Sequence, residues 1–472
     1  MWKLIQFSSL LLGALVSPTR TCRIHNSGRS ADCVGRQLSA VPRGQLPSSL
    51  QDVDLSYNNL QAVHADDFLR LPLLRVLQLQ FNNISHIHVD AFKHNPLLES
   101  LNVFNNSLEE IPAGALTPLS DLKQLLMSNN LYKHATLAES FSKLVKLQDL
   151  SMGGPLVMGL KKADFLPLKN IRLQSFAIKC SSNLSYYEPG SLEVIRTRQM
   201  GFDMAVDQQP GVLVHMLHDI ANNNFSVIQF RNLFEYMYYT GEEDIFRGLN
   251  DINALQLIIH RGKFNEHLLR MALMNLQIGL IRRLRVQYID FARSPTFSDT
   301  GASSRITNLT IDKLDLWYIS NPDVLRFDWR FTGSTRSSKL SIRYVYFNYV
   351  PCDSWVEMEG VELLDISYCR LQRHHAKPPH FNASSNELTS LEDLSVLTSD
   401  FRQLKVLDVS NNKLGSAEDS RNCVWTNITR LIAHHNQFVS EALLCLPTTV
   451  QHLDLSHCDL DQLDTTFFER GN

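Results

Sequence analysis

Three stretches of the sequence repeat one pattern: LQDVDLSYNNL at 50–60, LRVLQLQFNNI at 74–84 and LESLNVFNNSL at 98–108. Each has apolar residues at its first, fourth, sixth and eleventh positions and asparagine at its ninth. The pattern continues as LKQLLMSNNLY at 122–132 and LQDLSMGGPLV at 147–157, so the starts lie 24, 24, 24 and 25 residues apart. It returns as VELLDISYCRL at 361–371, LKVLDVSNNKL at 404–414, ITRLIAHHNQF at 428–438 and VQHLDLSHCDL at 450–460. A fixed period of this length indicates a stacked repeat architecture.

Each conserved position of the pattern has a physical role. The L-x-L part predicts a short strand that turns alternate side chains inward. An asparagine amide after the strand can hydrogen-bond the backbone of its own coil and of its neighbour, which an apolar side chain cannot do. These asparagines are Asn58, Asn82, Asn106, Asn130, Asn412 and Asn436. We expect a second apolar row, on the side away from the strands, from Phe68, Phe92, Leu116, Phe141, Phe165 and Phe468.

The pattern is therefore that of the leucine-rich repeat. It predicts an α/β solenoid, or horseshoe, with a parallel sheet on the concave face. The middle of the chain keeps the period poorly: INALQLIIHRGKF at 252–264, IRRLRVQYIDF at 281–291 and ITNLTIDKLDL at 306–316 align on leucine positions but lack the asparagine. A helical spacing fits PGVLVHMLHDIANNNF at 210–225. The central section is thus predicted to be irregular.

The start of the chain and its surface motifs indicate secretion. Residues 1–21 have a basic start and a short apolar stretch, which predicts a signal peptide too short to span a bilayer. Asn-x-Ser/Thr motifs predict glycosylation at Asn83, Asn105, Asn183, Asn224, Asn308, Asn382 and Asn427. The formal net charge of −3 gives no reason to expect a nucleic-acid partner.

Three local motifs resemble the extracellular part of Toll-like receptors, in particular the lipopeptide-sensing subfamily that includes types 1 and 2. They are YYEPGSL at 186–192, VPCDSWVEMEGVELLDIS at 350–367, and the 22-residue spacing of Cys423 and Cys445. The resemblance covers about residues 22 to 472. It implies a receptor that binds microbial lipopeptide or lipid, forms homo- or heterodimers with another Toll-like receptor, and lies on the extracellular face of the plasma membrane.

Some of the cysteines can be assigned to disulfides. Cys22 and Cys33, just before the first repeat, predict a disulfide in an N-terminal cap. The resemblance implies a second disulfide between Cys423 and Cys445. Cys369 occupies the asparagine position of its repeat, which favours a small buried thiol. The partners of Cys180 and Cys352 stay open, as does a Cys352–Cys369 pair that would distort this repeat.

The resemblance also divides the chain. Residues 22–49 are expected to form the cap, 50–160 regular repeats, 161–350 irregular central repeats, and 351–472 regular C-terminal repeats. The family's C-terminal cap, transmembrane helix and intracellular TIR domain have no counterpart in the sequence, so the last repeat is expected to be incomplete. This predicts either a piece of a longer membrane-anchored receptor or a short secreted form.

The implied lipid pocket falls at the border between the central and C-terminal repeats. An acyl-chain pocket needs an apolar lining, and this border is rich in aromatic residues. The candidate residues are Phe291, Leu316, Trp317, Tyr318, Phe327, Phe331, Phe347, Tyr349, Val350 and Pro351. The alternative is that these aromatics fill the core of coils that lack the asparagine.

Other classes of protein fit less well. No G-x-S-x-G, phosphate-loop, H-E-x-x-H or Cys-x-x-Cys motif occurs, so neither an enzyme nor a cofactor is expected. His434 and His435 are expected to face opposite ways along a strand, which disfavours a metal site. A secreted adhesion or matrix protein with leucine-rich repeats, or a soluble decoy receptor, remains the main alternative function.

Overall fold

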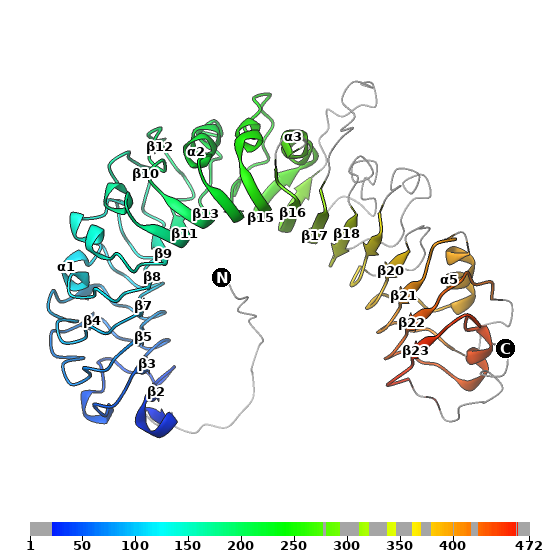
Figure 1. Cartoon of the computed structure of the whole chain (residues 1–472), viewed down its shortest axis with the longest axis horizontal. Coiled ribbons are helices and arrows are strands. Elements are labelled where there is room, and N and C mark those ends of the chain that lie inside the picture. The colour runs from blue at the N-terminus through cyan, green and yellow to red at the C-terminus, as the bar shows by residue number, and fades with distance from the viewer. Residues whose placement is uncertain are drawn as a thin grey trace. The chain divides into compact units, whose positions relative to one another are not determined.

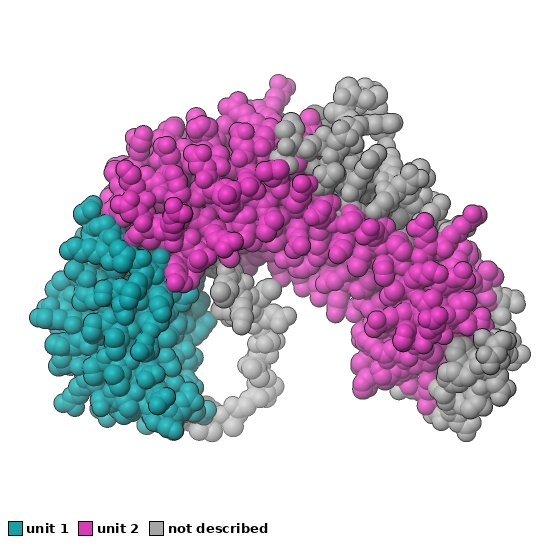
Figure 2. Space-filling view, viewed as in Figure 1, with its two compact units in different colours: residues 1–132, 138–147 teal, residues 133–137, 148–472 magenta. Residues whose placement is uncertain are grey.

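The computed structural model describes residues 21–276, 280–292, 311–320, 338–345, 361–369, 379–399, 401–416, 423–458 and 460. The chain forms two compact units, one of residues 1–132 and 138–147 and one of residues 133–137 and 148–472 (Figure 2). Except for Thr21, the predicted signal peptide lies outside the described residues. Within the described part of the chain, every helix is too short or too polar to span a membrane.

The first unit adds one short strand per coil to a parallel sheet. After an antiparallel β1–β2 pair, the order of the sheet is β2-β3-β5-β7-β8, and β4 pairs with β6 on a separate edge. The elements are β1 (Arg23–His25), β2 (Ser30–Asp32), β3 (Asp52–Asp54), β4 (Ala62–Val63), β5 (Val76–Gln78), β6 (His86–Ile87), β7 (Ser100–Asn102), α1 (Ala113–Leu116) and β8 (Gln124–Leu126), with 3₁₀ turns η1 (Asn26–Gly28), η2 (Arg43–Gln45) and η3 (Glu139–Lys143).

The second unit continues this plan with longer strands in its first half, and its helices lie on the side opposite the strands (Figure 1). Strand β9 pairs with β11 and β11 with β13, and from β13 to β23 each strand pairs with the next, always in parallel. Strand β10 pairs with β12 on a separate edge. The strands are β9 (Asp149–Gly153), β10 (Gly159–Leu160), β11 (Arg172–Lys179), β12 (Tyr186–Tyr187), β13 (Arg196–Asp203), β14 (Asn224–Arg231), β15 (Asn253–Asn265), β16 (Arg283–Ala292), β17 (Lys313–Ser320), β18 (Lys339–Arg343), β19 (Leu363–Asp365), β20 (His380–Asn382), β21 (Val406–Asp408), β22 (Arg430–Ile432) and β23 (His452–Asp454). The helices are α2 (Val212–Ile220), α3 (Glu266–Leu276) and α5 (Leu391–Thr398), and the 3₁₀ turns are η4 (Leu166–Leu168), η5 (Arg247–Asp251) and η7 (Ser440–Cys445).

The predicted asparagine ladder is confirmed. Asn82 is 6% exposed. Its Nδ2 donates to Leu55 O in the preceding coil and to Leu79 O in its own coil, both at 3.0 Å. Its Oδ1 accepts from Leu60 N at 3.1 Å. The buried amide therefore satisfies backbone groups of two successive coils, and the same arrangement recurs at Asn58, Asn106, Asn130, Asn412 and Asn436.

The second apolar row is also buried as expected. Phe68 and Phe92 are fully buried, and their ring centroids lie 6.1 Å apart. Leu116, Phe141 and Phe165 are 0–2% exposed. Phe468 lies outside the described residues.

One repeat escaped the sequence pattern. Strand β20 pairs with β19 and β21, and Asn386 follows it as a buried rung of the ladder. Its Nδ2 donates to Ile366 O at 2.9 Å and its Oδ1 accepts from Cys369 N at 2.8 Å. The repeat was missed because Phe381 and Ala383 replace the leucines and because Phe381 follows its register partner Leu364 by only 17 residues.

Two central alignments were wrong in register. Leu255, taken as an inward position, is 62% exposed, whereas Leu257 is buried and aligned with Leu284. In the next case Leu314 and Leu316 hold the fourth and sixth positions of the repeat, whereas the alignment that begins at Ile306 put them at its ninth and eleventh positions. Apolar residues are frequent in these segments. Without the asparagine, the sequence pattern does not determine which of them take the inward positions of the repeat.

The coils also vary in length in this region. Register partners are 24 residues apart from Leu77 to Leu101, but 30 apart from Leu284 to Leu314. The helix predicted within 210–225 is α2, at Val212–Ile220. The predicted section boundaries themselves stay predictions.

Candidate recognition surface

Strands β16 to β19 place arginine, aspartate and tryptophan side chains on the face of the sheet that points away from the core. Side chains alternate along each strand, so Leu314 and Leu316 of β17 are buried while Asp315 and Trp317 point to the sheet face. In register, Arg285, Asp315, Ser341 and Asp365 form one row across the four strands. Trp317 and Arg343 are paired in the next row.

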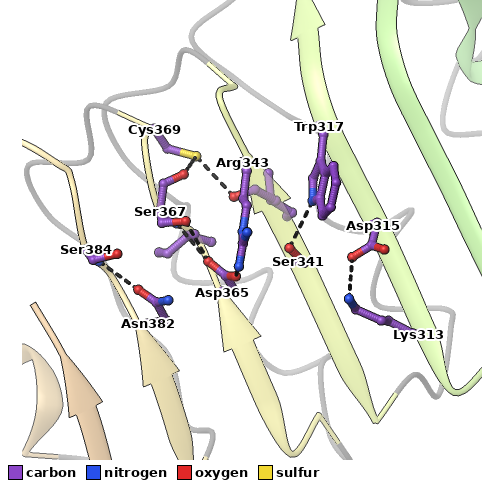
Figure 3. Close-up of polar contacts among 12 residues, drawn as sticks. Lys313, Asp315, Trp317, Ser341, Arg343, Asp365, Ser367, Cys369, Asn382 and Ser384 are labelled. Atoms are coloured by element: carbon purple, nitrogen blue, oxygen red, sulfur yellow. Dashed lines mark hydrogen bonds and ion pairs between the residues drawn. The ribbon is translucent and has the colours of Figure 1, made fainter. Parts of the chain in front are cut away.

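Trp317 lies between two guanidinium groups. The Arg285 Cζ is 4.1 Å and the Arg343 Cζ 5.5 Å from the ring centroid. The indole Nε1 donates to Ser341 Oγ at 3.1 Å (Figure 3). Cation–π contacts of this kind contribute about 0.5–2 kcal/mol each, depending on exposure. They fix the orientation of a ring that is still partly exposed.

Two buried carboxylates hold these arginines. Asp315 is 2% exposed, and its Oδ2 accepts from Arg285 Nε at 3.1 Å and Nη2 at 2.9 Å. Its Oδ1 is 3.1 Å from Lys313 Nζ. Asp365 receives Arg343 Nε at 2.7 Å, together with Nη2 (Figure 3). Burial lowers the pKa of Arg343, but the bond to Asp365 and nearby negative charge raise it, and the net direction is upward.

Four tyrosines are stacked next to this sheet face, and two of them, Tyr318 and Tyr344, directly follow Trp317 and Arg343 in the sequence. Tyr288, Tyr318, Tyr344 and Tyr368 have successive ring centroids 4.4, 4.1 and 4.4 Å apart, with interplanar angles of 7°, 4° and 21°. We call them the tyrosine ladder. Tyr318 and Tyr368 are 36% and 45% exposed. Burial, followed by hydrogen bonds with its two neighbours, raises the pKa of Tyr318 above its ordinary value.

All four tyrosines have backbone φ angles between 52° and 59°. This left-handed conformation costs an L-residue about 1–2 kcal/mol, and asparagine tolerates it better than bulky residues do. The equivalent position has a positive φ in other coils too, at Asn129 and Asn411 and also at Tyr57, Phe81 and His435. Ring stacking contributes about 0.5–1.5 kcal/mol per pair beyond area burial, which offsets part of the strain.

The next coil towards the N-terminus adds a histidine. His260 Nδ1 lies 2.9 Å from Gln287 Nε2, so the ring nitrogen accepts a hydrogen bond in its neutral form. Burial, with Arg231 and Arg261 nearby, lowers the pKa of His260 to about 4. The ring also packs against Tyr288 at 5.3 Å and thereby extends the tyrosine ladder.

The structure distributes the predicted pocket residues over different environments. Leu316 is 1% exposed in the core, Trp317 lies on the sheet face and Tyr318 lies in the tyrosine ladder. Phe291 is half-buried near the end of β16, aligned with Phe264. Phe327, Phe331, Phe347, Tyr349, Val350 and Pro351 lie outside the described residues. The lipid pocket therefore stays a prediction.

The tyrosine ladder and the two Arg–Asp pairs were missed in the sequence. A signal was present: Tyr288, Tyr318, Tyr344 and Tyr368 each precede an apolar residue or cysteine and recur at intervals of 30, 26 and 24 residues. The intervals are too uneven for a fixed-period search to align. Only the strand register shows that they fall on one line.

The cysteine predictions agree with the structure where it describes them. Disulfides join Cys22 to Cys33 and Cys423 to Cys445. Cys369 is fully buried, and its Sγ lies 3.2 Å from Ile342 O and 3.3 Å from Ser367 O, where an asparagine amide would donate. Burial raises its pKa to about 12. Cys180 is a buried free thiol, and Cys352 lies outside the described residues.

The histidine prediction needs correction. His434 Nδ1 and His435 Nδ1 are 2.8 Å apart, not on opposite sides of a strand. The reason is that His435 follows the strand with a φ of 53°, which turns its ring back and stacks it on His457. Among the described residues, no three potential ligands of the His, Cys, Asp or Glu type converge as a metal site.

The glycosylation motifs fall on accessible positions where they can be seen. Asn83, Asn183, Asn224 and Asn427 are exposed. Asn105 and Asn382 are partly exposed, and Asn308 lies outside the described residues. Glycosylation itself remains a prediction at each.

Family models of the leucine-rich repeat and several known proteins are similar to this chain. The leucine-rich-repeat family model matches residues 36–84 and 72–131, and a second model of this repeat matches 447–462. Toll-like receptor 2 type-1 of Gallus gallus is 24% identical over 93% of this chain and 55% of its own length. Toll-like receptor 2 of Cricetulus griseus is 24% identical over 68% of this chain and 42% of its length. The solved mouse RP105/MD-1 complex aligns with a TM-score of 0.47 at 16% identity, over 95% of this chain and 90% of that one.

The strands, the asparagine ladder and the family model together define a leucine-rich-repeat solenoid protein. More particularly, the chain is similar in sequence to Toll-like receptor 2 of several species. It spans about half the length of the relatives it matches.

Proposed function

We propose that this chain is the ligand-recognising extracellular part of an innate-immune receptor. In this proposal it binds a microbial lipopeptide or lipid, and binding brings it together with a second Toll-like receptor at the plasma membrane. The observation that supports the proposal is the similarity to Toll-like receptor 2, which extends over 93% of the chain, central coils included. The role is recognition rather than catalysis.

The physical basis of lipid recognition is simple. Each methylene removed from water contributes about 0.8 kcal/mol, so two long acyl chains can drive binding without any ion pair. A pocket of this kind needs an apolar lining and a few polar groups at its mouth. The aromatic-rich border at 289–351 is the proposed place for it.

The test is size-exclusion chromatography with light scattering on the secreted, glycosylated chain. Diacylated and triacylated lipopeptides are compared with the same peptide lacking acyl chains. We expect co-elution or dimer formation only with the acylated forms. A folded monomer that binds none of them would overturn the proposal and favour an adhesion role.

Two valine variants locate the pocket. Val350→Asp places a charge in the predicted pocket and should abolish acyl-dependent binding. Val424→Asp is the matched control, because Val424 is 60% exposed and is not among the predicted pocket residues. If Val350→Asp binds lipopeptide as well as the control does, the predicted position of the pocket is wrong.

A further inference from the structure

We propose that the sheet face of β16 to β19, together with the tyrosine ladder, is a docking surface for an acidic segment of a protein partner. Two of its residues, Trp317 and Tyr318, are also among the predicted lipid-pocket residues, but the structure places them on the sheet face and in the tyrosine ladder. It goes beyond the proposed function, because it concerns a second partner and does not require acyl chains. Charge, register and composition support it independently.

The first observation is a row of like charges. Arg283, Lys313 and Lys339 stand at equivalent positions on three adjacent parallel strands. Adjacent strands are about 4.8 Å apart, and like charges directly opposite one another destabilise a sheet. Arg283 and Lys339 are exposed, and Lys313 is a third exposed. Asp315 compensates part of this charge through Lys313, and an anionic partner lying across the strands would add to that compensation.

The second observation is the charge balance of the surface. The three residues of the row stand beside Arg285 and Arg343, and the carboxylates in the same patch are Asp315 and Asp365. Cations thus outnumber carboxylates among these strand residues, with Arg285 and Lys313 both paired with Asp315 and Arg343 paired with Asp365. Complementary charge of this kind guides association and selects the partner.

The third observation is the type of side chain beside the charges. Trp317 lies between Arg285 and Arg343, and the exposed edges of the tyrosine ladder run along the end of the same strands. Tryptophan, tyrosine and arginine are the residues that most often dominate binding at protein–protein interfaces. This composition favours a polypeptide partner over a simple polyanion, which would need the cations alone.

The experiment uses the full secreted chain and a defined probe. The probe is a fluorescein-labelled peptide of about eight residues that alternates glutamate and leucine and extends over roughly 26 Å. Binding is followed by fluorescence anisotropy at two salt concentrations. The same peptide with lysine in place of glutamate and a heparin oligosaccharide serve as comparison ligands. We expect saturable binding of the glutamate peptide, weaker binding at higher salt, and no binding of the lysine peptide.

Variants place the site. Lys339→Glu should raise the Kd about tenfold, because it puts a repelling charge in the row. Arg430→Glu is the matched control, since Arg430 is an exposed residue at the same strand position on β22 and should leave the Kd nearly unchanged. Tyr344→Asn should fold, because asparagine suits a positive φ, and should weaken binding about fivefold.

Three results would overturn the proposal: no saturable binding of the glutamate peptide to the folded chain, equal losses for Lys339→Glu and Arg430→Glu, or binding of heparin without binding of the peptide. The last would assign the surface to a polysaccharide. The assay contains no lipopeptide. A negative result therefore does not affect the lipid proposal, and failure of lipid binding does not affect this one.

Discussion

Replacing Asn106 by alanine tests the central structural claim, that the asparagine ladder holds successive coils together. The side chain is 7% exposed and makes three short hydrogen bonds in the first unit, besides a longer one from Nδ2 to Phe104 O at 3.4 Å. Its Oδ1 accepts from Ile84 N at 3.0 Å. Its Nδ2 donates to Leu79 O at 3.0 Å and to Val103 O at 3.1 Å.

The three bonds do not contribute equally. Leu79 O also accepts from Asn82 at 3.0 Å, and Val103 O also accepts from Asn130 at 3.0 Å. Both carbonyls therefore keep one partner, and each lost bond costs about 1 kcal/mol. The Ile84 N–H is left buried without its acceptor, which costs about 1–3 kcal/mol. The total expected loss of unfolding free energy is about 3–5 kcal/mol.

The assay is urea unfolding followed by far-UV circular dichroism, combined with hydrogen exchange of the peptide that contains Ile84. Asn59→Ala is the matched control, because Asn59 is next to a ladder residue but exposed, and surface substitutions usually stay within about 0.5 kcal/mol. We expect faster exchange at Ile84 in Asn106→Ala alone. A loss below about 1 kcal/mol with Ile84 still protected would show that the ladder is not what fixes the coils.

Three further predictions follow from buried or half-buried groups in the second unit. Tyr187→Phe removes the 2.5 Å bond from Tyr187 Oη to the buried Asp219 and should cost about 1.5–3 kcal/mol in urea unfolding; an unchanged midpoint would contradict this. The pKa of His260 is about 4 in the folded chain and about 6.5 when unfolded, so only the unfolded chain takes up a proton in this window. Stability should therefore fall as the pH drops from about 6.5 to 4, and His260→Gln should flatten that slope in thermal melts; an equal slope in both proteins would refute it. Burial raises the pKa of Cys180 and Cys369, so iodoacetamide should label them only after unfolding; mass spectrometry that finds either labelled in the native chain would contradict their burial.

The features predicted most reliably from the sequence are those that recur in many copies of the repeat. The asparagine positions and the row that begins with Phe68 recur at a constant interval, so each copy supports the reading of the others. Both disulfides were also predictable, one from its place before the first repeat and one from the resemblance. Burial of Cys369 followed from its position in the repeat.

The recognition surface was far less accessible to prediction. Whether Leu255 or Leu257 faces inward depends on which strands pair, and that is a tertiary choice between two apolar patterns. The tyrosine ladder depends on left-handed backbone at residues such as Tyr318, and sequence propensity argues against that conformation for tyrosine. Trp317 was predicted as a pocket residue because this region is rich in aromatic residues, and nothing in the sequence indicated that its ring contacts two guanidinium groups.

The unequal coil lengths have a consequence for how this protein can change. The chain takes 30 residues from Leu284 to Leu314 but 17 from Leu364 to Phe381, and in both cases the two strands pair in register. An insertion on the return path would therefore lengthen the connection and leave unchanged which side chains stand next to each other on the sheet. Substitutions in the strands thus change the side chains on the sheet surface, whereas insertions between strands change only the connecting segments.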